Sequence, residues 1–490
     1  MRHLKLLQFS PVDFCGRLDF LSNELRYLSW CIYPFDYLPS NFQPDNLVGL
    51  ILNDSRIKKL WKDTKPLPNL RLLDLYRSES LIELPHFGEA PNLERLCLKG
   101  CIQLRQIDAS IGLLKKLTEL DLRECENLIS VPSSILGLNS LEYLSLSGCS
   151  KLRMLLDEPR DGEHLKKLCR GEAPIHSLSA SSILPEDLCS ISRMRELDLS
   201  YCSLRQIPDT IGNLHCLEWL NLRGNKFGTL PSLKELSKLY YINLASCKQL
   251  KCLPELPSRT HLSSEIYLSP FRDVIGSRGI NIFDCPELVD REGCSSMCFS
   301  WMMQIVKAHH QYPRFSPLRK PCVESVIQGS EIPRWFNNQH EGMGNLMIID
   351  TPPLIQHDNN WIGIACCVIF RFHDRMITTL PIFPLRTEPL HTLGVEIPWV
   401  PFNEEDMKTS DRIWLFYFTR QQLISQCCVG RMPDRADFKF KFEIRRTPLF
   451  ESRVKEYGYR WVYEEDVKHS NVTTMHSGDL LPQKRKAFGN

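Results

Sequence analysis

The chain has 490 residues, with 60 Lys and Arg against 58 Asp and Glu, so its formal net charge is +2. This balance excludes the strongly basic surface of a dedicated nucleic-acid-binding protein, and a hydrophobic content of 43% excludes wholesale disorder. The longest nearly unbroken apolar run, Trp361 to Phe370, is far shorter than the roughly 20 residues of a membrane-spanning helix, so it predicts a buried strand instead.

Leucines recur at a fixed spacing through the first half of the chain. The segments that begin at Leu93, Leu117 and Leu141 share the pattern L-x-x-L-x-L-x-x-C. Eleven such units start between Leu4 and Leu239, at intervals of 21 to 29 residues. Leucine-rich repeats have a period of about 20–29 residues, so this spacing predicts a solenoid of stacked repeats.

The spacing within a unit indicates how each repeat folds. Two leucines that are two positions apart have the period of a strand with one buried face. One unit cannot bury its apolar edge alone, so the units stack and their strands form a parallel sheet on a concave face. We therefore predict an α/β leucine-rich-repeat solenoid over residues 1–258.

Cysteines fall in register at the ninth position of the repeat. We expect a ladder of small buried groups whose S–H or amide donors meet backbone carbonyls, and we expect the thiols to be reduced because no export signal precedes them. The cysteines in this register are Cys101, Cys125, Cys149, Cys202, Cys247 and Cys285, with Asn225 in the same position.

The leucine pattern decays after residue 258. Residues 259–314 are predicted to hold one last partial repeat at 279–288, a short helix at 301–310 that caps the core, and a linker. Residues 315–467 are rich in aromatic and β-branched residues, a composition that predicts an antiparallel β-sandwich. Residues 468–490 are polar, and we expect them to form a disordered tail. The strands expected in the sandwich are 361–372, 412–419, 437–444 and 458–467.

Several segments resemble the plant intracellular immune receptors of the TIR–NB–leucine-rich-repeat class. The segment LRYLSWCIYPFDYLPSNFQPDNLVGLILNDSRIKKLW (25–61) resembles the opening repeats of that family. GSEIPRWF (329–336), NNWIGIACCVIF (359–370) and VKEYGYRWVYEEDV (454–467) resemble its C-terminal jelly-roll domain. The resemblance implies a disease-resistance role in innate immunity, with a pathogen effector or a guarded host protein as the ligand.

The family's upstream modules are missing from this sequence. No G-x-x-x-x-G-K-[ST] loop is present to bind nucleotide phosphates, and the resemblance assigns NAD cleavage to a TIR domain that is absent. We therefore expect the C-terminal half of a receptor, from a truncated gene product or a partial gene model, without enzyme activity. An upstream nucleotide-binding receptor module is a possible partner. No catalytic, cofactor-binding or metal-binding residue is predicted.

The position just before the middle leucine faces away from the repeat core. In the C-terminal units it holds Tyr143, Trp219 and Tyr241, and exposed aromatic side chains on a concave surface are typical binding anchors. Arg123 and Arg223 add charge to the same face. These five are the candidate ligand-contact residues. The alternative is that the aromatics cover the sheet or pack on the adjoining β-domain.

The leading hypothesis is a non-enzymatic protein-recognition module in the cytoplasm. A basic tail segment, Lys484-Arg485-Lys486, could also assist entry into the nucleus. One alternative is a leucine-rich-repeat adaptor in another intracellular pathway. A second is a carbohydrate-active jelly-roll enzyme, which would need paired carboxylates in a cleft; Glu404, Glu405 and Asp406 form a polar run there with no evident partner. Neither nucleic acid nor a membrane is an expected partner.

Overall fold

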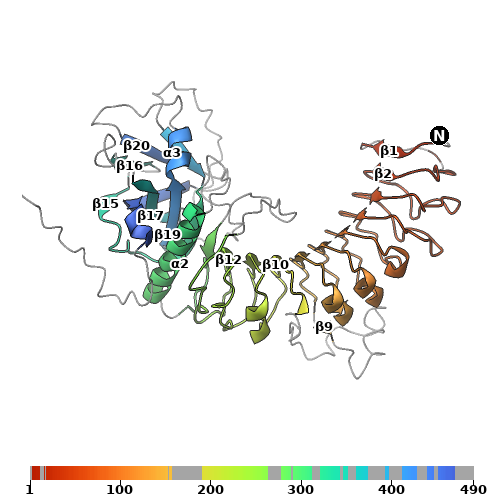
Figure 1. Ribbon diagram of the computed structural model, residues 1–490, viewed down its shortest axis with the longest axis horizontal. Coiled ribbons are helices and arrows are strands. Elements are labelled where there is room, and N and C mark those ends of the chain that lie inside the picture. The colour runs from red at the N-terminus through yellow and green to blue at the C-terminus, as the bar shows by residue number, and fades with distance from the viewer. Residues whose placement is uncertain are drawn as a thin grey trace, which may run out of the picture. The chain divides into compact units, whose positions relative to one another are not determined.

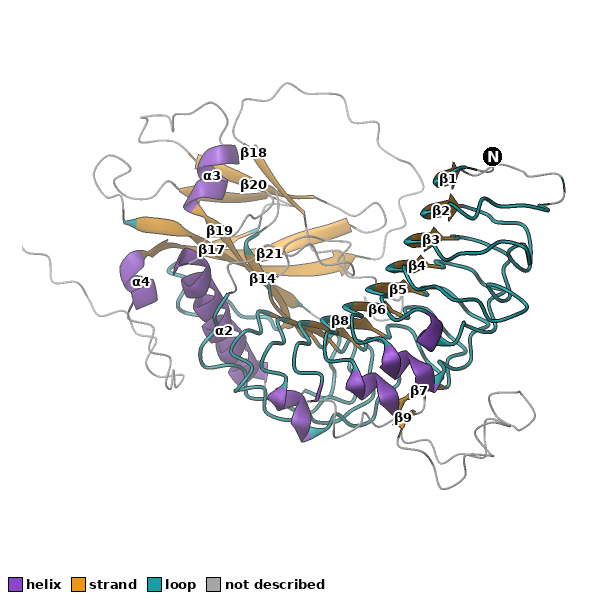
Figure 2. Cartoon of the chain, turned by 45° about the vertical axis from the view of Figure 1, so that its right-hand side comes forward, coloured by secondary structure: helices purple, strands orange, loops and turns teal. Residues whose placement is uncertain are grey.

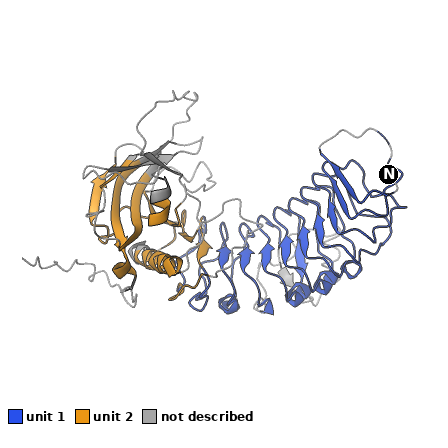
Figure 3. Ribbon diagram, turned by 45° about the horizontal axis from the view of Figure 1, so that its top comes forward, with its two compact units in different colours: residues 1–239, 246–255, 269–272 blue, residues 240–245, 256–268, 273–490 orange. Residues whose placement is uncertain are grey.

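In a computed structural model, the chain forms two compact units (Figure 3). The first unit comprises residues 1–239, 246–255 and 269–272, and the second comprises residues 240–245, 256–268 and 273–490. Within these units the structure describes residues 3–10, 16, 18–152, 154–156, 190–262, 278–288, 291–311, 321–342, 346–350, 360–373, 392–396, 411–426, 439–445 and 451–468.

Short parallel strands build the first unit. Figure 1 shows them side by side in chain order along the concave side of a curved row. They are β1 (Leu6–Phe9), β2 (Tyr27–Trp30), β3 (Gly49–Ile51), β4 (Leu72–Asp74), β5 (Arg95–Cys97), β6 (Glu119–Asp121), β8 (Tyr143–Ser145), β10 (Glu196–Asp198) and β11 (Trp219–Asn221). The predicted repeat solenoid is confirmed, but one of the eleven expected units is not: β8 pairs directly with β10, so the unit expected from Leu165 adds no strand between them.

The segments that return from one strand to the next carry single turns of 3-10 helix. They are η1 (Phe87–Glu89), η2 (Ala109–Leu113), η3 (Ser133–Gly137) and η6 (Asp209–Asn213). A short parallel pair, β7 (Ser130–Pro132) and β9 (Met154–Leu156), lies on the same return path. The middle leucines of neighbouring strands pair directly, as Leu96 does with Leu120, and both have no exposed surface.

The cysteine ladder has the predicted form. Each thiol donates a hydrogen bond to the carbonyl oxygen of the leucine that directly follows the neighbouring strand: Cys101 to Leu75, Cys125 to Leu98 and Cys149 to Leu122, all at 3.2 Å, and Cys202 to Leu146 at 3.0 Å. The Asn225 amide takes the same place with a 2.9 Å bond to Leu199. The described cysteines are free thiols.

A left-handed turn stands just before the ladder position, with a regularity that the leucine pattern does not predict. The residue at this point has a positive φ in successive repeats, whether or not it is glycine. The residues are Ile32, Asp54, Arg77, Gly100, Glu124, Gly148, Tyr201, Gly224, Ser246 and Asp284. The turn redirects the chain from the strand into the return segment.

The second unit begins with two further repeat strands and continues as a sheet. Strand β12 (Tyr241–Asn243) is parallel to β13 (Gly279–Asn281), and β13 pairs with β14 (Val323–Gln328). The Cys285 thiol donates to the Leu244 carbonyl at 3.2 Å, which confirms the partial repeat at 279–288. The predicted cap helix is longer than expected and runs over Arg291–Gln311 as α2.

Two sheets form the predicted β-sandwich of this unit (Figure 2). After β14, the antiparallel order is β19 (Arg412–Thr419), β17 (Trp361–His373), β21 (Glu451–Tyr463) and β15 (Asn338–Glu341). The second sheet is β16 (Leu346–Asp350), β20 (Lys439–Arg445) and β18 (Thr392–Glu396). Tyr457 of β21 ties the sheets together, because its hydroxyl bonds the backbone N–H and carbonyl of Ile348 at 3.1 and 3.0 Å.

Three details of the sandwich differ from the sequence-based expectations. The β18–β20 pair is parallel, so the domain is not purely antiparallel. The last strand ends at Tyr463 rather than at residue 467, because the acidic segment Glu464–Lys468 forms helix α4. A short helix, α3 (Arg420–Gln426), also follows β19. Apart from Lys468, the predicted tail lies outside the described residues.

No helix in the described part of the chain is both long and apolar enough to cross a membrane.

Candidate functional site

The concave face of the first unit presents two rows of side chains, one on each side of the middle leucine. Strand register sets the rows, because Arg95 pairs with Glu119, Glu119 with Tyr143, Tyr143 with Glu196 and Glu196 with Trp219. The second row follows as Asp74, Cys97, Asp121, Ser145, Asp198 and Asn221. These rows therefore hold five carboxylates and one basic side chain, that of Arg95.

The first row contains an ion pair between neighbouring strands. Arg95 donates from Nε to Glu119 Oε2 at 2.6 Å and from Nη2 to Oε1 at 3.4 Å. The Arg95 side chain is 55% exposed, whereas that of Glu119 is only 12% exposed. The arginine thus covers the carboxylate and turns its own surface outward.

The acidic residues of the second row have a structural role. Asp74, Asp121 and Asp198 each accept a hydrogen bond at Oδ1 from the backbone N–H two residues further on, at 3.0 Å in all three cases. Asn221 makes the same contact with Arg223 at 3.2 Å. These side chains hold the turn that leaves each strand, so they are fixed features of the face.

Burial alters the titration of several of these groups. Desolvation raises the pKa of Glu119, and the hydrogen bond and charge of Arg95 counteract part of that rise. Desolvation likewise raises the pKa of Asp74 and of Asp198, against the backbone and side-chain hydrogen bonds that lower it. The protonation state of each of these three carboxyl groups therefore depends on the groups that hydrogen-bond to it or pair with its charge.

Two of the predicted aromatic anchors are buried rather than exposed. Tyr143 and Trp219 are each only 8% exposed, and desolvation raises the Tyr143 pKa well above its usual range. The expectation that they stand exposed on the face is wrong. Their role in ligand contact stays a prediction.

The other three predicted residues, Tyr241, Arg123 and Arg223, each have different neighbours. Tyr241 belongs to the second unit, where it is half-buried against a small core of Tyr240, Leu262 and Ala308. Arg123 is held by Asp121, with Nη2 at 2.7 Å from Oδ2. Arg223 is 7% exposed and its guanidinium lies 5.5 Å from the centre of the Tyr201 ring.

The exposed groups on the face lie in earlier repeats than we predicted. Tyr27 is 47% exposed and its ring lies over Gly49, where an added Cβ would meet it at 2.7 Å. The Arg71 side chain is 64% exposed and 3.4 Å from Glu94. The repeat pattern places Tyr27 and Arg95 in the first row, but it gives no measure of which neighbours cover them.

No group of three or more His, Cys, Asp or Glu residues in the described ranges is arranged to hold a metal ion. Of the carboxylate run that a carbohydrate-active enzyme would use, Glu404 to Asp406, no residue belongs to the described ranges.

Comparison with known proteins relates the chain to a defined group. Residues 193–214 match the leucine-rich repeat family, and residues 327–468 match the C-JID domain family, which overlaps the predicted sandwich. The chain is 30% identical over 463 residues to disease resistance-like protein DSC1 of Arabidopsis thaliana, covering 73% of this chain and 37% of that protein. The chain is a homologue of plant disease resistance proteins.

Two other relatives align with nearly the whole of this chain. The chain is 24% identical to TMV resistance protein N of Nicotiana glutinosa, and the alignment covers 98% of this chain and 50% of that protein. It is 26% identical to disease resistance protein RPS4B of Arabidopsis thaliana, with 95% of this chain and 43% of that protein covered. The homologue therefore spans half or less of the length of these relatives, and the resemblance to the TIR–NB–leucine-rich-repeat class is confirmed.

Proposed function

We propose that this disease resistance homologue is a non-enzymatic recognition module whose first-unit concave face binds a protein ligand. The ligand is a pathogen effector or a host protein that the receptor guards. The observation that supports this most strongly is the exposed, partnered charge on β4 to β6, where Arg71 and Arg95 stand over Glu94 and Glu119.

The geometry suits protein recognition for a physical reason. Paired charges are held in place before a ligand arrives, so binding orders few side chains and loses little conformational entropy. The mixed charge of the face favours a partner with complementary charges and disfavours other proteins, which gives specificity. The exposed Tyr27 ring adds apolar area with a polar tip, as interface anchors do.

The five residues selected from the sequence keep a place in this proposal. Tyr143, Trp219 and Arg123 lie farther along the same face and offer smaller exposed areas. Arg223 and Tyr241 complete that set, the latter from the second unit. We expect their substitution to weaken binding less than substitution of Arg71 and Arg95.

The test is a pairwise binding screen of residues 1–490 against a panel of purified pathogen effectors and host proteins. For any protein that binds, the chain with Arg71→Glu and Arg95→Glu should bind at least tenfold more weakly, because attractive contacts become repulsive. The chain with Lys115→Glu and Lys116→Glu, two exposed lysines on a return segment, is the control. Ligands that bind both variants equally would argue against the concave face.

We also propose that the protein acts in the cytoplasm, with access to the nucleus. The free thiols of the cysteine ladder support a reducing compartment, where such thiols persist. Localisation of the tagged chain in plant cells tests this.

A further inference from the structure

The return segment of the third repeat carries a concentration of positive charge that the concave face does not use. Five basic residues and only one acidic residue, Asp63, lie between positions 56 and 65: Arg56, Lys58, Lys59, Lys62 and Lys65. The whole chain has a net charge of only +2, so this segment is a distinct basic patch.

Part of this charge is already neutralised. Lys58 lies 2.7 Å from Asp36, and Lys59 forms an ion pair with Glu83. Lys65 instead donates to the backbone carbonyl of Ser40 at 2.7 Å, and the Lys62 ammonium lies 5.4 Å from the centre of the Tyr37 ring. Neither of these last two contacts is with an anion, so two ammonium charges remain uncompensated by a carboxylate in the described part of the chain.

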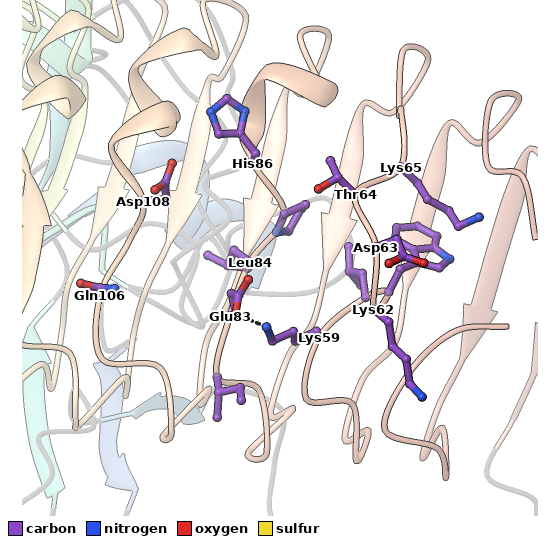
Figure 4. Close-up of a pocket in the computed structure, with 14 residues that line it drawn as sticks. Lys59, Lys62, Asp63, Thr64, Lys65, Glu83, Leu84, His86, Gln106 and Asp108 are labelled. Atoms are coloured by element: carbon purple, nitrogen blue, oxygen red, sulfur yellow. Dashed lines mark ion pairs between the residues drawn. The ribbon is translucent and has the colours of Figure 1, made fainter. Parts of the chain in front are cut away.

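A hollow of about 430 Å³ lies beside these two lysines (Figure 4). In Figure 4, Lys62 and Lys65 are at one end and Gln106 and Asp108 at the other, with the Lys59–Glu83 pair between them. The hollow therefore crosses three repeats. At a strand spacing of about 4.8 Å, this is roughly 10 Å, the length of three extended residues.

The lining between the two ends is partly apolar. Ile82 is 52% exposed there, next to the half-buried Leu84. Trp61 also lines the hollow; it is 7% exposed, and its indole N–H has no acceptor among the described residues. An unsatisfied buried donor and an exposed aliphatic side chain both favour an occupant that brings an acceptor and apolar area.

We propose that this hollow binds a short extended acidic peptide of a partner protein, as a second surface independent of the concave face. An Asp or Glu of the peptide pairs with Lys62 and Lys65, and the next apolar side chain covers Ile82 and Leu84. A nucleic acid or an anionic membrane fits less well, because Asp63, Glu83 and Asp108 line the same hollow and would repel a continuous row of phosphates. A peptide can instead place a single acidic residue at Lys62 and Lys65 and neutral or basic residues near Glu83 and Asp108.

The experiment selects peptides from a random ten-residue phage library on the full chain. Enrichment of Asp or Glu next to an apolar residue is expected. A selected peptide, made synthetically, should bind roughly tenfold more weakly to the Lys62→Glu, Lys65→Glu variant, since two attractive contacts become repulsive. The matched control is Lys115→Glu, Lys116→Glu, whose lysines also contact neutral acceptors, the Gly137 carbonyl and the Asn92 amide oxygen, and should leave binding unchanged.

A second pair of variants tests the apolar part. Ile82→Asp should also weaken binding, whereas Leu113→Asp, at a residue with the same 52% exposure, should not. Circular dichroism confirms that all four variants are folded. The proposal is overturned if the library yields no acidic enrichment, if the lysine pairs act equally, or if only duplex DNA or phosphatidylserine vesicles bind in a Lys62- and Lys65-dependent way.

Discussion

At the residue scale, the left-handed turn before each ladder position is the most demanding local feature of the repeats. A non-glycine residue with positive φ carries a steric cost of about 1–2 kcal/mol, yet Ile32 and Tyr201 occupy this position. The repeats tolerate the cost because the stacked core fixes the chain on both sides. Glycine at Gly100, Gly148 and Gly224 avoids it.

Gly148→Ala should therefore destabilise the first unit by about 1 kcal/mol. A Cβ at Gly148 would meet nothing closer than 3.5 Å, so the cost comes from its φ of +78° rather than from a clash. Gly137→Ala is the control, since its nearest neighbour is the flexible end of Lys115 at 3.4 Å and its φ lies outside the left-handed region. Urea unfolding of both variants measures the difference. Equal losses would contradict the backbone explanation.

The thiol ladder makes a second prediction at this scale. Cys125→Ala removes the donor to the Leu98 carbonyl and should cost about 1–2 kcal/mol of unfolding free energy. Cys125→Ser should cost less than half as much, because Ser78 fills the equivalent position and donates to Leu52 at 2.8 Å. Urea midpoints compare the two. If serine and alanine lose the same stability, the hydrogen bond contributes nothing.

At the element scale, the strands could be predicted from the sequence, but the residues at which they end and the exposure of their side chains could not. The period-two leucines and the continuous apolar run at Trp361 identified strands because burial of one or both faces leaves a pattern in residue types. Helix α4 (Glu464–Lys468) was missed because a short acidic turn closely follows a strand and has no apolar period of its own. The parallel β18–β20 pair depends on topology, which no local pattern encodes.

The candidate site was predictable only in part for the same reason. Register placed Tyr143 and Trp219 on the outward row, but exposure depends on side chains from neighbouring repeats. Arg95 was not selected, although its pairing with Glu119 gives the face its exposed charge.

The pair between β5 and β6 predicts a pH-dependent effect. The folded-state pKa of Glu119 is raised, so Glu119 favours folding below its unfolded-state pKa and loses that contribution as pH rises through the folded value. Arg95 offsets this loss by stabilising the carboxylate. Arg95→Gln should thus cost about 1 kcal/mol at pH 7 and clearly less at pH 4, where Glu119 is protonated.

Unfolding curves at the two pH values test this. Arg71→Gln is the control, because its partner Glu94 is 42% exposed and solvent screens the pair. A cost of Arg95→Gln that does not change with pH would mean that its packing, rather than its charge, matters.

At the scale of the whole molecule, the reactivity of the cysteine thiols reports which cysteines are buried in the two units. The chain has 20 cysteines, and burial raises the pKa of Cys101, Cys125, Cys149, Cys298 and Cys366 well above the usual thiol value. We expect all 20 to react with a thiol reagent after denaturation without reductant. In the native protein the ladder should stay unreactive, and among the described cysteines the exposed Cys252 should react first. Fewer thiols after denaturation would reveal disulfides and contradict the reduced ladder.

Recognition of a protein on the concave face of the first unit can be tested most directly by hydrogen–deuterium exchange of the full chain, alone and with a ligand from the binding screen. We expect slower exchange on binding in the segments that hold β2 to β6, around Tyr27, Arg71 and Arg95. Protection confined to the return segments or to the second unit, with no change in those strands, would contradict it.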